Sequence, residues 1–272
     1  MTASNGFEWT DESWGPGLRS PALGRLADHL FTTCQLRLRG QDEDADWERV
    51  ACAVGLPTDR LLRVRQVHGN RAAVVRPGSV RWSADGGRPE ADIVASDDPD
   101  IAVAVQVADC VPLLMAGASG TVVAAVHAGW RGTAANAAAT GVALLATEFG
   151  VEPGDLVVAQ GPSIGPCCYT VGPELVEQFE AAGFGASVGR WFQQDPGGRW
   201  RLDLWTANME QLVAAGVRPD AIRVARLCTA CHPELFHSYR RDGAGTGRIA
   251  AVVRPSRRLD PSPGSPGGRP RY

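Results

Sequence analysis

Three side chains that can do chemistry stand where apolar, strand-like runs meet a Gly or Pro turn: His68, Cys110 and His127. Strand ends that meet at one rim of a sheet are common places for functional sites. Two imidazoles and a thiolate form a three-ligand set for zinc with one open position, and they also suit trigonal copper or a Cys–His nucleophile pair. Their long spacing lacks short metal-binding repeats, so a buried His pair beside an inert Cys stays open as well.

A central stretch, residues 122–133, reads V-V-A-A-V-H-A-G-W-R-G-T. Its Val-rich start predicts a strand, and the alanine-rich residues 134–146 predict a helix with Thr133 near its N-cap. Arg131 would then lie beside free backbone N–H groups, where an anion is favoured. A surface ion pair is the alternative for this arginine.

Two further motifs carry reactive groups. Residues 228–232 read C-T-A-C-H, a sequence that resembles a haem attachment motif of exported proteins, but we expect no export signal. A structural zinc on Cys228, Cys231 and His232 would be cramped, so core or loop positions are favoured, and the adjacent Cys167 and Cys168 are expected to pack. Residues 239–243, Y-R-R-D-G, suit contact with phosphate or purine, or are a solvated charged run.

The elements that must position these groups can be outlined from the apolar runs and turn signals. A loose leader is expected over residues 1–20, one domain over 21–253 and a disordered Pro/Gly/Arg tail over 254–272. The fold class is α+β, with many short strands and helices packed outside. Strands are predicted at residues 31–39, 61–67, 72–76, 91–95, 101–107, 113–116, 122–126, 156–159, 200–202, 222–225 and 249–253. Helices are predicted at residues 47–54, 134–146, 173–182 and 204–214, the last capped by Asp203.

Composition narrows the function classes. The 272 residues carry a net charge of -3, which gives no general attraction to nucleic acid or to a membrane surface. All 27 basic residues are Arg, so mechanisms that need a Lys amine are excluded. No apolar run is long enough to span a bilayer, and seven Cys without a secretory segment predict a cytoplasmic protein with reduced thiols.

Six sequence blocks occur in an order that resembles the laccase-domain, YfiH-like family. They are Q-V-H-G (66–69), A-D-C-V-P-L-L (108–114), V-H-A-G-W-R-G-T (126–133), G-P-S-I-G-P-C-C-Y-x-V-G (161–172), D-L-x-x-A-N (203–208) and C-T…S-Y-R-R-D-G-x-x-T-G-R (228–248). The family has been labelled multicopper polyphenol oxidase and purine nucleoside phosphorylase. The resemblance spans residues 31–253. One departure is T-T-C-Q-L at residues 32–36, where the family often has T-T-R-x-G-G; another is F-H-S at 236–238 in place of F-F-S.

The resemblance implies a fold, a metal and an activity. The fold is a single domain of layered mixed sheets with outer helices, akin to the toxin-type cysteine hydrolase fold. His68, Cys110 and His127 would bind one Zn(II). The activity would be phosphorolysis of adenosine, inosine, guanosine and methylthioadenosine, together with adenosine deamination.

Roles follow for residues in the matching blocks. Asp109 is expected to orient the site or carry a proton, with a capping role as the alternative. Arg131 and Arg241 are candidate phosphate clamps, and Gln66 and Tyr239 are candidate substrate contacts. The partners would be a small-molecule nucleoside and phosphate, and the chain a monomer or small homo-oligomer.

Two rival functions stay open. The first is a copper-dependent polyphenol oxidase, although a multicopper site needs about ten His and this chain has five. Met115 is a candidate axial copper ligand, with a core position as the alternative. The second is a Cys–His amidohydrolase that edits cell-wall precursors, with Cys110 as nucleophile and His127 as base.

Overall fold

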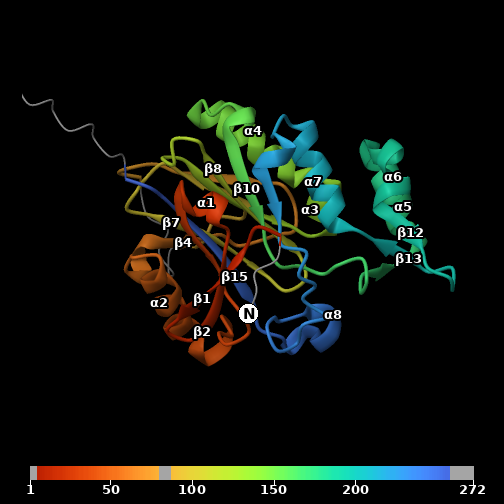
Figure 1. The fold of residues 1–272 in the computed structure, drawn as a ribbon, viewed down its shortest axis with the longest axis horizontal. Coiled ribbons are helices and arrows are strands. Elements are labelled where there is room, and N and C mark those ends of the chain that lie inside the picture. The colour runs from red at the N-terminus through yellow and green to blue at the C-terminus, as the bar shows by residue number, and fades with distance from the viewer. Residues whose placement is uncertain (1–4, 80–86, 258–272) are drawn as a thin grey trace, which may run out of the picture.

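Two six-stranded sheets and one small sheet form the framework of the chain (Figure 1). The computed structural model describes residues 5–79 and 87–257. In the first sheet the strand order is β1-β2-β3-β15-β7-β4. Its strands are β1 (Glu8–Glu12), β2 (Gly15–Arg19), β3 (Ala27–Phe31), β4 (Leu61–Arg63), β7 (Ala102–Val107) and β15 (Ile249–Pro255). The pairs are antiparallel except β4 with β7, so the sheet is mixed.

The second large sheet has the order β14-β10-β8-β9-β6-β5. Its strands are β5 (Ala72–Val75), β6 (Ile93–Ser96), β8 (Val111–Gly117), β9 (Val123–Ala128), β10 (Leu156–Gln160) and β14 (Ile222–Val224). The third sheet, β11-β13-β12, consists of β11 (Thr170–Val171), β12 (Phe192–Gln194) and β13 (Trp200–Leu202). Strand β8 pairs antiparallel with β9, and this pair leads directly into the candidate site.

The longer helices lie outside the two large sheets (Figure 1), whereas the short helix at Pro21–Gly24 contributes Leu23 to the core between them. The helices are α1 (Pro21–Gly24), α2 (Glu43–Ala53), α3 (Trp130–Ala134), α4 (Ala137–Phe149), α5 (Pro173–Phe179), α6 (Gly185–Trp191), α7 (Leu204–Ala214) and α8 (Tyr239–Asp242). A π-helical segment, Glu180–Phe184, joins α5 to α6. Within the described residues, none of these helices combines the length and apolar character needed to cross a membrane.

Alternation along the central strands explains the layering. Val103 and Val105 of β7 belong to the core between the two sheets, whereas Ala102 and Ala104 face the core under α2. In β8, Leu114 belongs to the inter-sheet core and its neighbours on the opposite face belong to the core under α4 and α7. Successive side chains of a strand point to opposite faces, so strands covered on both sides are apolar throughout. Met115 lies in the core under the helices, as its alternative interpretation predicted.

Several sequence predictions agree with these elements. The helix predicted at residues 204–214 is α7, and the Asp203 carboxylate accepts a hydrogen bond from the Thr206 backbone N–H at 3.0 Å. A carboxylate in this position satisfies one of the N–H groups that a helix start leaves unpaired. The strand predicted at residues 200–202 is β13.

Other predictions were wrong. The predicted loose leader contains β1 and β2, because this hairpin pairs onto β3 and forms the edge of the first sheet. The strand predicted at residues 31–39 lies earlier, at β3, because Leu18 pairs with Phe31 and the chain turns after Thr33. The predicted tail contains the end of β15, while residues 258–272 lie outside the described chain.

The predicted helix at residues 134–146 is two helices. Helix α3 starts at Trp130 with Gly129 as N-cap, and Asn136 in the left-handed conformation separates it from α4. Thr133 therefore does not cap a helix; it is buried in α3, and its hydroxyl accepts a hydrogen bond from the Asn208 amide at 3.0 Å. The motif V-H-A-G-W-R-G-T enters a helix four residues earlier than predicted.

Candidate metal centre

The fold brings together His68, Cys110 and His127, which are far apart in sequence. His68 lies in the turn between β4 and β5, Cys110 joins β7 to β8, and His127 belongs to β9. One ligand atom of each residue lies within 4.8 Å of those of the others. The two imidazole centroids are 4.8 Å apart and the rings meet edge to face, with an interplanar angle of 81°. These distances leave room for one ion between the three side chains.

The β8–β9 register explains how Cys110 reaches the histidines. Val111 pairs with Ala128 and Pro112 with His127, so Cys110 and Gly129 face each other just beyond the paired strands. A Cβ atom at Gly129 would lie 2.7 Å from the Cys110 sulfur, a distance that real Cβ contacts do not reach. Glycine is required here for steric reasons, since its backbone φ of -71° suits any residue.

Asp92 holds two of the three candidate ligands in place. It is fully buried just before β6, and its Oδ1 lies 2.7 Å from His127 Nδ1. The same carboxylate accepts hydrogen bonds from the backbone N–H groups of His68, at 2.9 Å, and Gly69, at 2.7 Å. It thereby stabilises His68 in the left-handed conformation, with φ at 62°.

The charge of Asp92 determines the tautomer of His127. Burial raises the pKa of this carboxyl, but the hydrogen bonds from His127 and from the backbone N–H groups outweigh burial and lower the pKa overall. The ionised carboxylate only accepts, so His127 Nδ1 carries the proton and Nε2 is left to bind a metal. A carboxylate on the second nitrogen is the usual way in which a ligating imidazole is oriented.

Cys110 and His127 stabilise each other as an ion pair. Burial opposes the charged thiolate, but the His127 imidazolium, together with His68, lowers the pKa of Cys110 to about 6. Burial likewise opposes the imidazolium, and the Cys110 thiolate and Asp92 raise the pKa of His127 to about 9. The sulfur is therefore a thiolate at neutral pH, which is the form that binds metals or attacks as a nucleophile.

This donor set fits a single divalent transition metal. Two nitrogens and one thiolate are typical zinc ligands, and three protein ligands leave the fourth position for substrate or water. The five histidines are all in the described chain, and only His68 and His127 meet at this centre. His29, for example, is buried in the first sheet, where it accepts a hydrogen bond from the Ser20 backbone N–H at 2.7 Å. The histidines thus do not assemble a multicopper cluster.

A cavity of about 920 Å³ opens over the centre. Its polar lining is strongly basic, with five arginines and one carboxylate, whereas its apolar part is aromatic and aliphatic. The lining includes Arg65, Arg88, Arg131, Arg240, Arg248, Asp109, Trp130, Tyr169, Tyr239, Ile164 and Leu204. An excess of positive charge beside aromatic side chains suits a ligand with a planar ring and an anionic group.

Two of the predicted site residues line this cavity but are anchored to the protein. The Gln66 amide exchanges two hydrogen bonds with the backbone of Gln106, at 2.7 and 2.8 Å. Asp109 accepts from the Thr229 hydroxyl and from the Arg240 backbone N–H, both at 2.6 Å, and so holds the first turn of α8, whose N-cap residue is Ser238. Both carboxylate oxygens of Asp109 are therefore engaged in hydrogen bonds to the surrounding loops.

The two arginines predicted to bind phosphate, Arg131 and Arg241, have different surroundings in the structure. Arg131 lines the cavity and stacks on Trp130, with 4.2 Å from the guanidinium carbon to the ring centroid. Arg241 does not line it: its guanidinium binds the Asp242 carboxylate and the carbonyl oxygens of Thr229 and Phe236. Arg241, the second candidate phosphate clamp, is thus held away from the cavity lining, whereas its neighbours Tyr239 and Arg240 in helix α8 belong to that lining.

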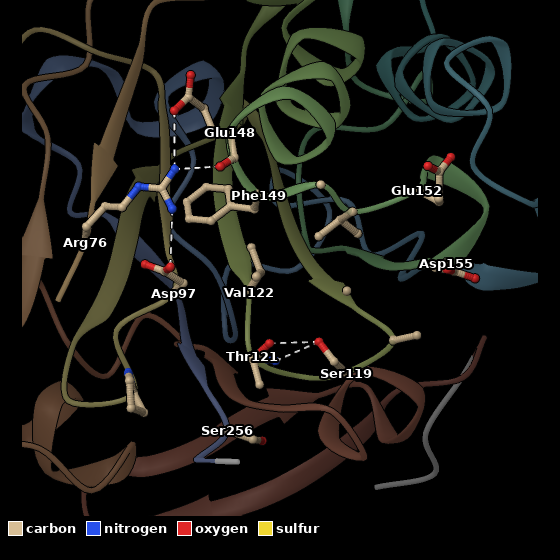
Figure 2. A pocket seen from close by; sticks show the side chains of 15 residues that line it. Arg76, Asp97, Ser119, Thr121, Val122, Glu148, Phe149, Glu152, Asp155 and Ser256 are labelled. Carbon is tan, nitrogen blue, oxygen red and sulfur yellow. Dashed lines mark hydrogen bonds and ion pairs between the residues drawn. The ribbon is translucent and has the colours of Figure 1, made fainter.

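A second cavity lies away from this centre, between Arg76 and the loop before β9 (Figure 2). Figure 2 shows Arg76 bridging Asp97 and the carboxylate of Glu148, at 3.3 and 3.4 Å, with its guanidinium over the ring of Phe149. The basic group of this cavity is therefore neutralised by its own neighbours. The candidate chemistry belongs to the cavity over Cys110.

Sequence reasoning missed Asp92. Its only signal is that a single acidic residue stands directly ahead of the apolar run I-V-A at residues 93–95. Many acidic residues stand before strands as turn formers. Only the pairing of β6 with β9, in which Ile93 lies opposite Val126, brings this carboxylate beside His127.

Comparison with known proteins agrees with the fold. Residues 29–255 match the model of the family described as "Multi-copper polyphenol oxidoreductase laccase". The purine nucleoside phosphorylase YlmD of Geobacillus stearothermophilus is 38% identical over 208 residues, 75% of this chain and 76% of its own. The adenosine deaminase RL5 of an unknown prokaryotic organism is 34% identical over 206 residues, 73% of this chain and 76% of its own.

Solved structures show the same architecture. The crystal structure of the hypothetical protein YfiH of Bacillus licheniformis superposes with a TM-score of 0.81 and 26% identity, over 91% of this chain and 97% of that one. The α+β class predicted from the sequence is confirmed. Together with the family match over residues 29–255, these likenesses show that the chain belongs to the laccase-like family described as multi-copper polyphenol oxidoreductase.

Proposed function

We propose that this chain is a zinc-dependent purine nucleoside enzyme, which performs phosphorolysis of purine nucleosides and deamination of adenosine. The observation that carries the proposal is the meeting of His68, Cys110 and His127 under a basic, aromatic cavity. The names of the relatives, purine nucleoside phosphorylase and adenosine deaminase, support the substrate class. We place the enzyme in the cytoplasm, acting on a small nucleoside and inorganic phosphate.

The metal would be held by His68, Cys110 and His127, with Asp92 orienting His127. A zinc ion in such a set supplies a Lewis acid that polarises an oxygen atom within its reach. The chain itself supplies a thiolate that is already deprotonated at neutral pH and an imidazole whose free nitrogen is set by Asp92. When the metal binds, His127 must release its Nε2 proton, because the Cys110 thiolate and Asp92 stabilise the imidazolium in the metal-free protein.

The cavity supplies the binding groups for phosphorolysis. In this reaction a phosphate oxygen bonds to the ribose C1′ while the bond from C1′ to the purine nitrogen breaks, and the base leaves with the electron pair and takes up a proton. Arg131, whose guanidinium lies over the Trp130 ring, would bind the phosphate dianion, and Arg240 and Arg248 add positive charge to the same cavity. Tyr169 and Tyr239 line the cavity, and we propose that their rings contact the base.

Deamination would use the same cavity without phosphate. A water oxygen bonds to the purine carbon that carries the amine, and the amine leaves as ammonia. The two reactions share the nucleoside and differ in the nucleophile, so phosphate distinguishes them.

The test is metal analysis of the purified protein with product analysis on adenosine. We expect zinc, formation of adenine that depends on phosphate, and formation of inosine without phosphate. If the zinc-loaded protein forms neither adenine nor inosine, the proposal is rejected. Colour is a further check, because a blue copper–thiolate absorption would favour the polyphenol oxidase instead.

A Cys–His amidohydrolase is the second candidate, and the lowered pKa of Cys110 favours it. Zinc and a thiolate nucleophile need the same sulfur, so a chelator separates the two functions. Chelation removes the nucleoside activities if zinc is required, whereas it preserves or increases hydrolysis of a cell-wall amide if Cys110 is the nucleophile.

A further inference from the structure

A second cluster of metal-ligating side chains lies outside the centre described above. The sulfur atoms of Cys167, Cys168, Cys228 and Cys231 all lie within 4.8 Å of one another. Cys231 Sγ is 3.5 Å from Cys167 Sγ and 3.4 Å from Cys168 Sγ. We propose that these four cysteines bind one structural zinc ion, which joins the two loops that carry them.

The sulfur separations suit a single ion. Four sulfurs at about 2.3 Å from a tetrahedral zinc lie about 3.8 Å from one another. The observed contacts of 3.4 and 3.5 Å and the limit of 4.8 Å bracket this value. All seven cysteines are free thiols, and these separations exceed the disulfide bond length of about 2.05 Å. A multi-iron cluster would need the four sulfurs to be spread more widely than they are.

The backbone around Cys228 has the form of a metal-binding turn. Cys228 and Cys231 have the C-x2-C spacing common at zinc sites, and the Cys231 N–H donates to the Cys228 carbonyl at 3.2 Å. The Gly165 backbone N–H points at the Cys228 sulfur from 3.3 Å. This N–H group and that of Cys231 lower the pKa of Cys228 against the opposing effect of burial. The turn therefore stabilises a thiolate.

The remaining cysteines need a cation if they are to be charged together. Burial and the neighbouring sulfurs raise the pKa of Cys167, and they raise the pKa of Cys168 to about 11. Mutual repulsion of this kind is removed when a divalent ion sits between the sulfurs. His232 does not belong to the cluster, because its Nδ1 lies 3.3 Å from the exposed Glu234 carboxylate.

The zinc site would fix two loops that also hold residues of the cavity over Cys110. Ser163 and Cys228 form a parallel β-bridge between the two loops, in which the Thr229 N–H donates to the Ser163 carbonyl at 3.1 Å. The first loop places Ile164 and Tyr169 in the cavity wall, and the second holds Asp109 through the Thr229 hydroxyl. A four-coordinate zinc has no open position, so it acts by fixing these loops.

The experiment counts zinc in the full chain and its variants, purified under reducing conditions. We expect two equivalents in the native protein, one in Cys231→Ser and one in His68→Ala. The exposed Cys52 lies in α2, outside both clusters, so Cys52→Ser is the matched control and keeps two. Cys231→Ser should also lower Tm by about 5 to 10 °C.

A second measurement does not need a variant that folds. Cys167 and Cys231 are as exposed as Cys52, yet bound zinc should protect them from alkylation by iodoacetamide while Cys52 reacts. Co²⁺ added to zinc-free protein should give the intense absorption of a tetrahedral tetrathiolate complex, which the His68–Cys110–His127 centre cannot produce. Equal alkylation of all three cysteines in zinc-loaded protein, a disulfide within the cluster, or iron in place of zinc would overturn the proposal.

The zinc counts distinguish failure of the four-cysteine site from failure of the proposed zinc centre at His68, Cys110 and His127. A single zinc that disappears in His68→Ala and persists in Cys231→Ser rejects only the four-cysteine site. A zinc that disappears only in Cys231→Ser supports that site and rejects the proposed function.

Discussion

The Asp92 carboxylate lies 2.7 Å from His127 Nδ1 and also accepts the backbone N–H of His68 at 2.9 Å. One buried charge thus sets the tautomer of one candidate ligand and the backbone conformation of another. The position of this carboxylate determines whether the two imidazoles can share an ion.

Asp92→Asn should weaken zinc binding at the His68–Cys110–His127 centre about 10- to 100-fold, because the amide lacks the charge that orients His127. Competition with a coloured chelator measures the affinity, and kcat/KM for adenosine should fall with it. Asp97→Asn is the matched control, since Asp97 pairs with Arg76 in the other cavity (Figure 2). Unchanged zinc affinity in Asp92→Asn would contradict the role given to this carboxylate.

His127→Ala should remove one equivalent of zinc and the nucleoside activities together. The loss follows because His68 and Cys110 alone leave two of four coordination positions without protein ligands. Elemental analysis and turnover on adenosine measure both effects in one preparation. His232→Ala, at an exposed position outside the centre, should change neither. Turnover by metal-free His127→Ala would exclude a zinc mechanism.

Gly129→Ala should disrupt the centre without unfolding the chain. The added Cβ would lie 2.7 Å from the Cys110 sulfur, so the sulfur must move, and we expect kcat/KM to fall about tenfold or more. Circular dichroism checks the fold and kinetics the activity. Gly189→Ala is the control: its Cβ meets open space within α6, and Ala there should stabilise the helix by up to about 1 kcal/mol. A fully active Gly129→Ala would show that the sulfur has more room than its neighbours indicate.

Cys110 in metal-stripped protein should react with iodoacetamide over an unusual pH range. A pKa lowered to about 6 means that the thiolate persists from alkaline pH down to about pH 6 and is lost as the pH falls further. An ordinary free thiol loses it near pH 8.5. The rate of Cys110 alkylation, followed by peptide mass spectrometry, should therefore be half-maximal near pH 6. In His127→Ala the midpoint should move up, because the main stabilising charge is gone; an unchanged midpoint would assign the effect elsewhere.

Arg131→Gln should raise KM for phosphate about tenfold while leaving phosphate-independent deamination of adenosine within about twofold. The reason is that Arg131 lines the cavity, whereas the guanidinium of Arg241 is held by Asp242 and two carbonyl groups. Arg241→Gln should instead lower Tm with little change in KM for phosphate. If the two variants exchange these effects, the phosphate lies nearer to α8 than we propose.

Local chemistry made part of this structure readable from the sequence. The amphipathic pattern of residues 204–214 and the cap at Asp203 predicted α7, and the apolar runs of β7, β9 and β10 predicted strands. These patterns are readable because they depend on neighbours within a few positions. The hairpin β1–β2 was missed since its sequence is polar and contains Gly and Pro, and its strands are formed by pairing with each other and with β3. The sequence alone does not tell which of the adjacent Arg240 and Arg241 faces the cavity. In the structure Arg240 lines the cavity, and the Arg241 guanidinium binds the Asp242 carboxylate.

The amino-acid sequence by itself determined the kinds of ligand, the strands that carry them, the absence of lysine chemistry and the family resemblance. Only the tertiary structure decided which groups meet. Asp92 reaches His127 through the β6–β9 pairing, and Cys167 and Cys168 reach Cys231 across 63 or more residues. Helix and strand patterns arise from interactions between near neighbours. A metal site or a buried ion pair depends instead on atoms that the packing of distant segments brings within a few ångströms of one another.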